Sequence, residues 1–228
     1  MTKLWTYVAA GALILGSSVA SAGPITWGPS QNTASPFDVS TSGTSVEAVN
    51  ASTQSSGTVT INGVTFDNRD DLLGNDFGNA LAGASSGDSD YDELLNTFNF
   101  GGGTSTSINI ADGLLSVGGS YLVQVWFTDL RSDFDDRVMT FGDGEGNTQD
   151  LNASGERGLG QFAVGRFSAT DTSQGLSLSS NGFANAHITG YQVREVPEPA
   201  TLMLLALGLV GIGVASAAGR RSDSSSAV

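Results

Sequence analysis

The feature that most constrains this chain is its C-terminal end, where an uncharged apolar run of 19 residues, 200–218, precedes two arginines. As a helix at about 1.5 Å per residue, the run spans roughly 28 Å, which matches the hydrocarbon thickness of a bilayer. A helix also pairs its own backbone polar groups, as lipid requires. Arg220 and Arg221 follow at once, and such positive flanks stay in the cytoplasm. The sequence therefore predicts a transmembrane helix with the polar tail 222–228 inside the cell and everything before Val196 outside.

Directly before this run stands the motif Val196-Pro197-Glu198-Pro199. The order of proline motif, apolar helix and basic stop over residues 196–221 resembles the PEP-CTERM sorting signal of Gram-negative bacteria that make extracellular polysaccharide. The resemblance implies that an exosortase, a membrane-embedded transpeptidase-like enzyme, recognises the motif and cleaves near it. The inner membrane would then tether only the precursor, and the ectodomain would pass to the cell surface or the biofilm matrix. The alternative is a permanent tail anchor, in which the prolines merely stiffen the segment before the helix.

The N-terminus is typical of an exported protein. Residues 1–22 contain a short positive region with Lys3, an apolar core, and the small residues Ala20 and Ala22 of an A-x-A cleavage site. We expect a signal peptide that is removed after Ala22, so that the mature chain begins at Gly23. An uncleaved signal anchor is the alternative.

The remaining chain is acidic and free of cysteine. Residues 23–199 hold 22 of the 23 acidic residues, six arginines and no lysine, a net charge of −16. Nucleic acid is excluded as a partner, because binding phosphates requires a basic face. Disulfides are absent although the compartment would permit them, so the fold must depend on its own core or on bound ions. The length suits one domain, which we assign to residues 23–195.

Alternating apolar residues between Gly-, Asn- and Asp-rich turns predict an all-β ectodomain. The clearest hairpin is Thr58–Phe66, with Asn62-Gly63 as a type I′ turn. The strongest strand is Tyr121–Thr128, with Tyr121, Val123, Val125 and Phe127 on one face and Leu122, Gln124, Trp126 and Thr128 on the other. We expect this strand to be central and its second face to be partly covered.

Only residues 91–98 show helical spacing, and residues 67–87 resemble a loop. Nine or ten short strands without alternating helices predict an antiparallel, jelly-roll-like β-sandwich rather than a doubly wound sheet. Further strands are predicted at residues 25–27, 37–39, 44–49, 107–110, 137–141, 160–168, 176–178 and 186–194.

A second resemblance lies in the later half of the ectodomain. A Gly-x-Tyr-x-Val-Gln-x-Trp strand ending at Trp126, the sequence Asp129-Leu130-Arg131, a return strand from Arg137 and a closing strand at 188–194 are similar to malectin-like and galactose-binding-like jelly rolls. The resemblance implies a domain that binds carbohydrate or supports proteins that do, and it assigns no ligand residue. An exposed Tyr121 or Trp126 would be the expected contact with extracellular polysaccharide.

Two acidic loops are candidate calcium sites. Ca²⁺ takes six to eight oxygen ligands, and the two loops offer oxygens at alternate positions. The candidate ligands are Asp88, Asp90 and Asp92 in the first loop and Asp143, Glu145 and Asn147 in the second. Solvated acidic turns are the alternative, and no other cofactor is predicted.

Catalytic motifs are few. Gly83-Ala84-Ser85-Ser86-Gly87 matches G-x-S-x-G, with His187 downstream, but a nucleophile elbow needs a strand before it and a helix straight after it. Acid pairs such as Asp135 and Asp136 could serve a glycosidase, which requires two carboxyl groups at a set distance from each other in space. We therefore predict a non-catalytic surface or matrix protein. The alternative is a secreted esterase or glycosidase displayed through the same sorting signal.

Overall fold

The computed structural model describes residues 23–54, 57–134, 136–153, 158–182 and 185–197. Both predicted apolar segments lie outside these residues, together with Ala20, Ala22, Glu198, Pro199, Arg220 and Arg221. Within the described ranges, no helix is long and apolar enough to span a bilayer. The signal peptide and the transmembrane helix therefore stay predictions.

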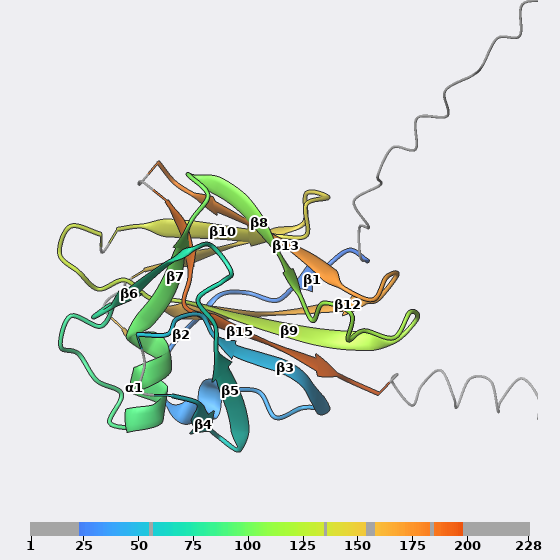
Figure 1. The fold of residues 1–228 in the computed structure, drawn as a ribbon, viewed down its shortest axis with the longest axis horizontal. Helices are drawn as coiled ribbons and strands as arrows, with labels where there is room; N and C mark the ends of the chain where they lie inside the picture. Colours follow the sequence, from blue (N-terminus) through green and yellow to red (C-terminus); the bar gives the residue numbers. More distant parts are fainter. Residues whose placement is uncertain (1–22, 55–56, 135, 154–157, 183–184, 198–228) are drawn as a thin grey trace, which may run out of the picture.

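The described chain is mostly β structure, as predicted (Figure 1). Its two helical segments are the 3-10 helix η1 (Pro36–Asp38) and α1 (Ser89–Leu95). The strands are β1 (Thr26–Trp27), β2 (Gln31–Asn32), β3 (Thr44–Asn50), β4 (Val59–Ile61), β5 (Val64–Asn68), β6 (Asn75–Gly78), β7 (Thr97–Gly101), β8 (Ser105–Ile110), β9 (Ser120–Phe127), β10 (Val138–Gly142), β11 (Thr148–Asn152), β12 (Gln161–Ser168), β13 (Gln174–Ser180), β14 (Ala186–Ile188) and β15 (Gly190–Glu195).

The strands form three sheets. The large sheet has the order β1-β12-β9-β15-β3-β5-β4, with β2 also paired to β12. A four-stranded sheet has the order β11-β10-β13-β8, and a three-stranded sheet has the order β14-β7-β6. The pairs are antiparallel except β3 and β5, which run parallel. In Figure 1 the four-stranded sheet lies above the large sheet, and α1 with the β4–β5 hairpin lies below it.

The main core fills the space between the large sheet and the four-stranded sheet. From β9 it receives Tyr121, Val123, Val125 and Phe127, which are the residues that the alternation predicted for one face. From the four-stranded sheet it receives Ile108, Ile110, Met139, Phe141, Leu151, Leu176 and Leu178. The prediction that β9 forms the centre of the core is confirmed.

A second core covers the opposite face of the large sheet. Trp126 of β9 is fully buried there, with its ring edge-on to Phe66 at 5.7 Å between centroids. The covering side chains come from the β4–β5 hairpin and from α1, and include Val59, Ile61, Val64, Tyr91, Leu94 and Leu95. Both faces of β9 are therefore fully covered, which is more than the partial cover that the sequence predicts.

Polar side chains on the same face hold the chain between η1 and β3. Gln124 and Gln192, neighbours on β9 and β15, are hydrogen bonded at 2.8 Å. Gln124 donates to the Asp38 carbonyl at 2.7 Å, and Arg194 donates to the Gly43 carbonyl at 2.8 Å. Buried polar groups need such partners, and the backbone between η1 and β3 supplies them while it covers the polar part of this face.

The described residues contain fifteen strands where nine or ten were predicted, and the single strand predicted at 186–194 is divided into β14 and β15, which lie in different sheets. Three further local predictions are wrong. Residues 37–39 form no strand, because Pro36 starts η1 and the Asp38 carboxylate accepts the Ala34 and Ser35 N–H groups at 2.6 and 3.0 Å. The loop predicted at 67–87 contains β6. The helix predicted over 91–98 ends at Leu95, since the following β-branched and aromatic residues pair as β7 with β6 and β14.

The Asn62-Gly63 turn is confirmed. Both residues have positive φ, 49° and 77°, between the antiparallel strands β4 and β5. This is the backbone that a type I′ hairpin requires.

Candidate functional site

A pocket of about 160 Å³ is the described cavity richest in aromatic rings and cations. It lies where β6 and β7 meet the connection from β9 to β10. We call it the arginine pocket, and it is lined by Phe77, Phe98, Phe100, Arg131, Phe134, Arg137 and Asn185. These residues come from four separate segments of the chain.

Arg131 is stacked between aromatic rings and tied to a buried carboxylate. Its guanidinium carbon lies 4.2 Å from the ring centre of Phe77 and 4.3 Å from that of Phe134. Its Nε and Nη2 donate to the two carboxylate oxygens of Asp129 at 2.7 and 2.8 Å, and Asp129 is fully buried. Cation–π contacts and a bidentate ion pair both fix the orientation of the guanidinium. About a quarter of the Arg131 side chain, 26%, stays exposed to solvent.

Arg137 lies deeper in the same pocket. Its Nη1 is 3.3 Å from Asp129 Oδ2, and its Nη2 donates to the Asn185 carbonyl. Its Nε is buried and has no hydrogen-bond partner among the described residues. Burial lowers the pKa of Arg137, although the charge of Asp129 opposes this shift, and a guanidinium stays protonated in proteins. Two guanidinium groups thus pair with one carboxylate.

A column of stacked rings joins the pocket to the main core. Phe77 stacks on Phe98 with centroids 5.0 Å apart, Phe98 on His187 at 4.1 Å, and His187 on Phe127 at 4.6 Å. His187 is fully buried, and neither ring nitrogen has a hydrogen bond of good geometry to the described residues. Burial, with the positive charges of Arg137 and Arg131, holds the pKa of His187 well below its usual value. The ring is therefore neutral and acts as a packing element.

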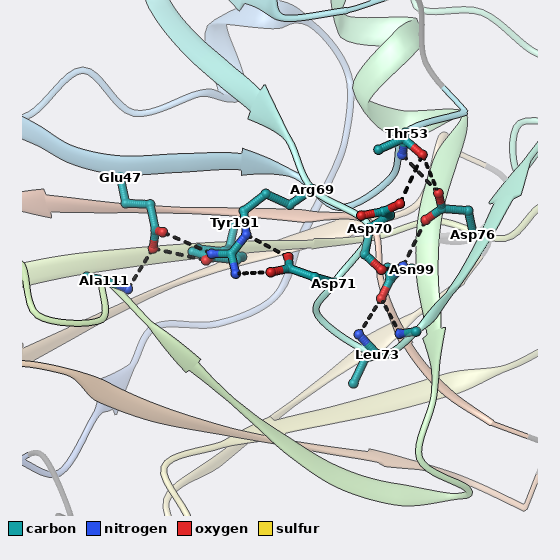
Figure 2. Close-up of polar contacts among 11 residues, drawn as sticks. Glu47, Thr53, Arg69, Asp70, Asp71, Leu73, Asp76, Asn99, Ala111 and Tyr191 are labelled. Carbon is teal, nitrogen blue, oxygen red and sulfur yellow. Dashed lines mark hydrogen bonds and ion pairs between the residues drawn. The ribbon is translucent and has the colours of Figure 1, made fainter.

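An amide and a carboxylate, those of Asn99 and Asp76, position β6 and β7 (Figure 2). Asn99, between the two pocket phenylalanines of β7, donates to Asp76 at 2.8 Å and to the Asp70 carbonyl at 2.9 Å. Its side-chain oxygen accepts the N–H groups of Leu73 and Gly74. Asp76 also accepts the Thr53 hydroxyl at 2.8 Å. The network fixes the turn into β6 and with it the ring of the next residue, Phe77.

A second network in Figure 2 anchors the start of the same connection. The Glu47 carboxylate accepts the Tyr191 hydroxyl at 2.9 Å and the Ala111 N–H at 2.6 Å, and it lies 3.3 Å from Arg69 Nη1. Arg69 also pairs with Asp71 at 2.8 Å. Burial and the nearby Glu47 charge raise the pKa of Tyr191, so its phenol stays protonated as a donor. These groups act as structural ties between β3, β15 and the β5–β6 connection.

The two halves of the suspected serine site have separate surroundings. Ser85 lies in the loop before α1, where its hydroxyl donates to the Asp92 carboxylate. His187 lies in β14 between two phenylalanine rings. The described contacts of neither residue include the other, and the absence of catalysis stays a prediction.

The acidic residues of the first loop point to different local partners. Asp88 caps α1 by accepting the Tyr91 N–H at 2.9 Å, and Asp92 accepts the Ser86 N–H at 2.6 Å. Asp90 faces the Thr60 N–H at 3.4 Å. Across the described ranges, no three Asp, Glu, His or Cys side chains form a group that could hold a metal ion. Calcium binding by either loop stays a hypothesis.

In the second loop, Asp143 organises the turn around Glu145 and Asn147. Its carboxylate accepts the Ile25 N–H at 2.9 Å, the Glu145 N–H at 2.8 Å and the Asn147 amide at 2.6 Å. Burial alone would raise the pKa of Asp143, but the hydrogen bonds from Asn147, Ile25 and Glu145 outweigh it and the pKa is lowered. The carboxylate therefore joins this turn to the N-terminal segment.

Asp143→Ala is expected to lower the free energy of unfolding by about 1.5–3 kcal/mol, because hydrogen bonds to a charged acceptor are lost. The measurement is urea unfolding at pH 7 with a chelator present, beside Asp112→Ala at an exposed loop position as the control. Because the pKa is lowered in the fold, this contribution is present above pH 3.8 and is lost as the pH falls further. Equal losses in both variants would contradict the structural role of Asp143.

Thermal melting with millimolar Ca²⁺ and Mg²⁺ tests the calcium hypothesis, which requires the melting temperature to rise with Ca²⁺ and much less with Mg²⁺.

At the far end of β9 from the arginine pocket, the chain leaves the fold. β15 ends at Glu195, and the Val196 N–H still donates to the Ser120 carbonyl at 2.9 Å. Gly23, Val196 and Pro197 line one pocket of about 410 Å³. Both predicted processing sites therefore border the same end of the ectodomain.

Comparison with known families finds a match on this tail. Residues 195–222 match the PEP-CTERM protein-sorting motif, within one residue of each predicted boundary. The sorting-signal prediction is confirmed. No curated protein matches the chain, and the malectin-like resemblance stays a prediction.

Proposed function

We propose that this chain, which carries a PEP-CTERM protein-sorting motif at residues 195–222, is a surface or matrix protein whose β-sandwich binds extracellular polysaccharide without catalysis. The motif itself implies an exported protein that is processed by an exosortase. The proposal adds the membrane tether of the precursor, the final location, and the binding role of the ectodomain.

The position of β15 carries the sorting part of the proposal. This strand is the middle one of the seven in the linear order of the eight-stranded sheet, and its last residue, Glu195, directly precedes the proline motif. All fifteen described strands lie before that point. Cleavage near the motif would therefore remove no described strand, which supports a domain designed to be separated from its tail.

The arginine pocket supports the binding part. The sequence suggested Tyr121 or Trp126 as the sugar contact if exposed, and this is wrong, because they are only 1% and 0% exposed. The pocket offers the partly exposed rings of Phe77 and Phe100 and the guanidinium of Arg131 instead. Ligand sites combine apolar walls with a few fixed polar groups, and a sugar ring has apolar C–H faces beside its hydroxyl groups.

Replacing Pro197, Glu198 and Pro199 by alanine is expected to block processing. The change keeps the apolar run and the arginines, so the precursor should still insert, but it removes the element that the enzyme recognises. Most of the protein should then stay cell-associated at precursor mass. Immunoblotting of cell and medium fractions from the native host, with intact mass of the released form, measures this.

Alanine at Pro29, an exposed proline outside the pocket that contains Pro197, is the control and should leave release unchanged. Unchanged release of the motif variant would contradict the sorting proposal. So would a released protein that still contains residues 202–214. A host strain without the exosortase should reproduce the phenotype of the motif variant.

A further inference from the structure

We propose that the arginine pocket binds a carboxylate-bearing sugar unit, a hexuronate, within the polysaccharide. The inference rests on the proposed function and specifies its substrate class. Its basis is the pairing of two arginines and one carboxylate beside an aromatic wall.

The lining of the arginine pocket is positively charged. Residues 23–199 carry 22 acidic residues against six arginines, yet the titratable residues that line this pocket are two of those arginines. The ion pairs that Arg131 and Arg137 form with described residues both go to Asp129. With Asp129 counted, two positive charges and one negative charge leave this group at +1, and the exposed Asp133 and Asp136 of the same loop are not part of the pocket lining. An anionic group therefore gains more there than a neutral one.

The hydrogen bonds of the two arginines with Asp129 leave a guanidinium donor for a ligand. Arg137 is only 4% exposed, and its buried Nε has no partner among the described residues. The Nε atom is itself buried and does not face the cavity, so the donors open to a ligand are those of the partly exposed Arg131. Arg131 is fixed by Asp129 through Nε and Nη2, which leaves Nη1 outside that pair. A carboxylate matches the planar donor geometry of guanidinium groups.

The volume of the pocket and the rings that line it suit a single sugar unit. The volume of about 160 Å³ is below the roughly 300 Å³ at which sites for drug-sized ligands begin, so the pocket suits a single compact unit. Phe77, Phe100 and Phe134 are the partly exposed rings of the lining and form an apolar wall beside Arg131. A hexuronate offers a C–H face for the wall and a carboxylate for the arginines on one ring.

The wall and the cation are both held in place before binding. Asn99 bonds to the turn into β6, the rings of Phe98 and His187 stack at 4.1 Å, and Asp129 orients Arg131. A ligand therefore meets side chains that need little reordering, which lowers the entropic cost of binding.

The test uses the mature protein purified from its host and two polymers that differ in one group, polygalacturonate and its methyl ester. Titration calorimetry should show binding to the acid and much weaker binding to the neutral ester. Arg131→Gln should weaken binding of the acid by about 10- to 100-fold, the range for a lost charge-assisted hydrogen bond. Arg166→Gln, the same change at an exposed position on β12, is the matched control and should bind like the parent.

Arg131→Lys keeps a positive charge beside Asp129 and covers the case in which Arg131→Gln fails to fold. A lysine lacks the bidentate fork, so binding should still fall clearly while the circular dichroism spectrum stays that of the parent. Parental affinity in every folded Arg131 variant would overturn the pocket assignment.

The polymers separate this inference from the proposed function. Equal binding of acid and ester overturns the hexuronate inference and leaves polysaccharide binding intact. Absence of binding to both polymers and to the polysaccharide of the host overturns both.

Discussion

Replacing Phe127 by alanine is expected to lower the free energy of unfolding by about 3–5 kcal/mol. The side chain is fully buried, lies in the main core, and ends the ring column that runs through His187. Removing it leaves a cavity between two sheets that cannot both shift to fill it. Since domains are typically stable by about 5–15 kcal/mol, the variant should lose a large share of its stability. Urea unfolding followed by far-UV circular dichroism measures the change.

Phe37→Ala is the matched control, because it makes the same chemical change where the ring is 81% exposed. Its effect should stay within about 0.5 kcal/mol, as for most surface substitutions. Ser85→Ala should also be small, since Ser85 is exposed and its partner Asp92 keeps the Ser86 N–H. A Phe127→Ala loss no larger than that of Phe37→Ala would show that the core lies elsewhere.

Acid is expected to destabilise the domain well above the range in which carboxylates titrate. His187 is neutral in the fold with a lowered pKa, whereas in the unfolded chain it takes up a proton near pH 6.5. The unfolded state then binds more protons, so stability rises with pH up to about 6.5 and is constant above it. Below pH 6.5 this residue removes about 1.4 kcal/mol per pH unit until the folded pKa is reached. Unfolding free energies between pH 7.5 and 4.5 give the slope.

The chain contains a single histidine, so the slope can be assigned without ambiguity. His187→Phe keeps an aromatic ring in the column and removes the titrating group, and it should flatten the profile between pH 6.5 and 4.5. The fold also lowers the pKa values of Asp71, Asp92 and Asp143. Their contribution to stability changes only below pH 3.8, and the change should be the same in parent and variant. The same slope in both proteins would contradict a neutral, buried His187.

The parts of the fold that the sequence predicts are those carried by local pattern. Alternation along residues 121–128 identifies both faces of β9, and Asn62-Gly63 identifies a hairpin, because each signal lies within a few neighbouring residues. The sorting signal is likewise a contiguous motif, matched at residues 195–222. Such features need no knowledge of which strands meet.

The arginine pocket could not be predicted in the same way. Phe77, Phe98 and Arg131 belong to β6, β7 and the β9–β10 connection, and only the pairing of β6 with β7 and of β7 with β14 brings them together. The sequence placed Phe77 in a loop and Phe98 at the end of a helix. Arg131 stood out only as part of a motif that resembles jelly rolls. The end of α1 was predicted wrongly for a related reason. After Leu95, strand pairing in the three-stranded sheet overrides the helical spacing of the sequence.

The central place of β15 also decides how the domain would carry tension. The strand pairs with β3 and β9 along its length, begins at Gly190 opposite Trp126 of β9, and points toward the end where the chain leaves the fold (Figure 1). A pull between a bound polymer and a membrane tether would load these ladders along the strand, in shear. Hydrogen bonds loaded in that direction must break together, and resistance to force depends on the unfolding rate. In the tethered precursor of the proposed function, the tail would therefore pull on a strand that is paired on both sides.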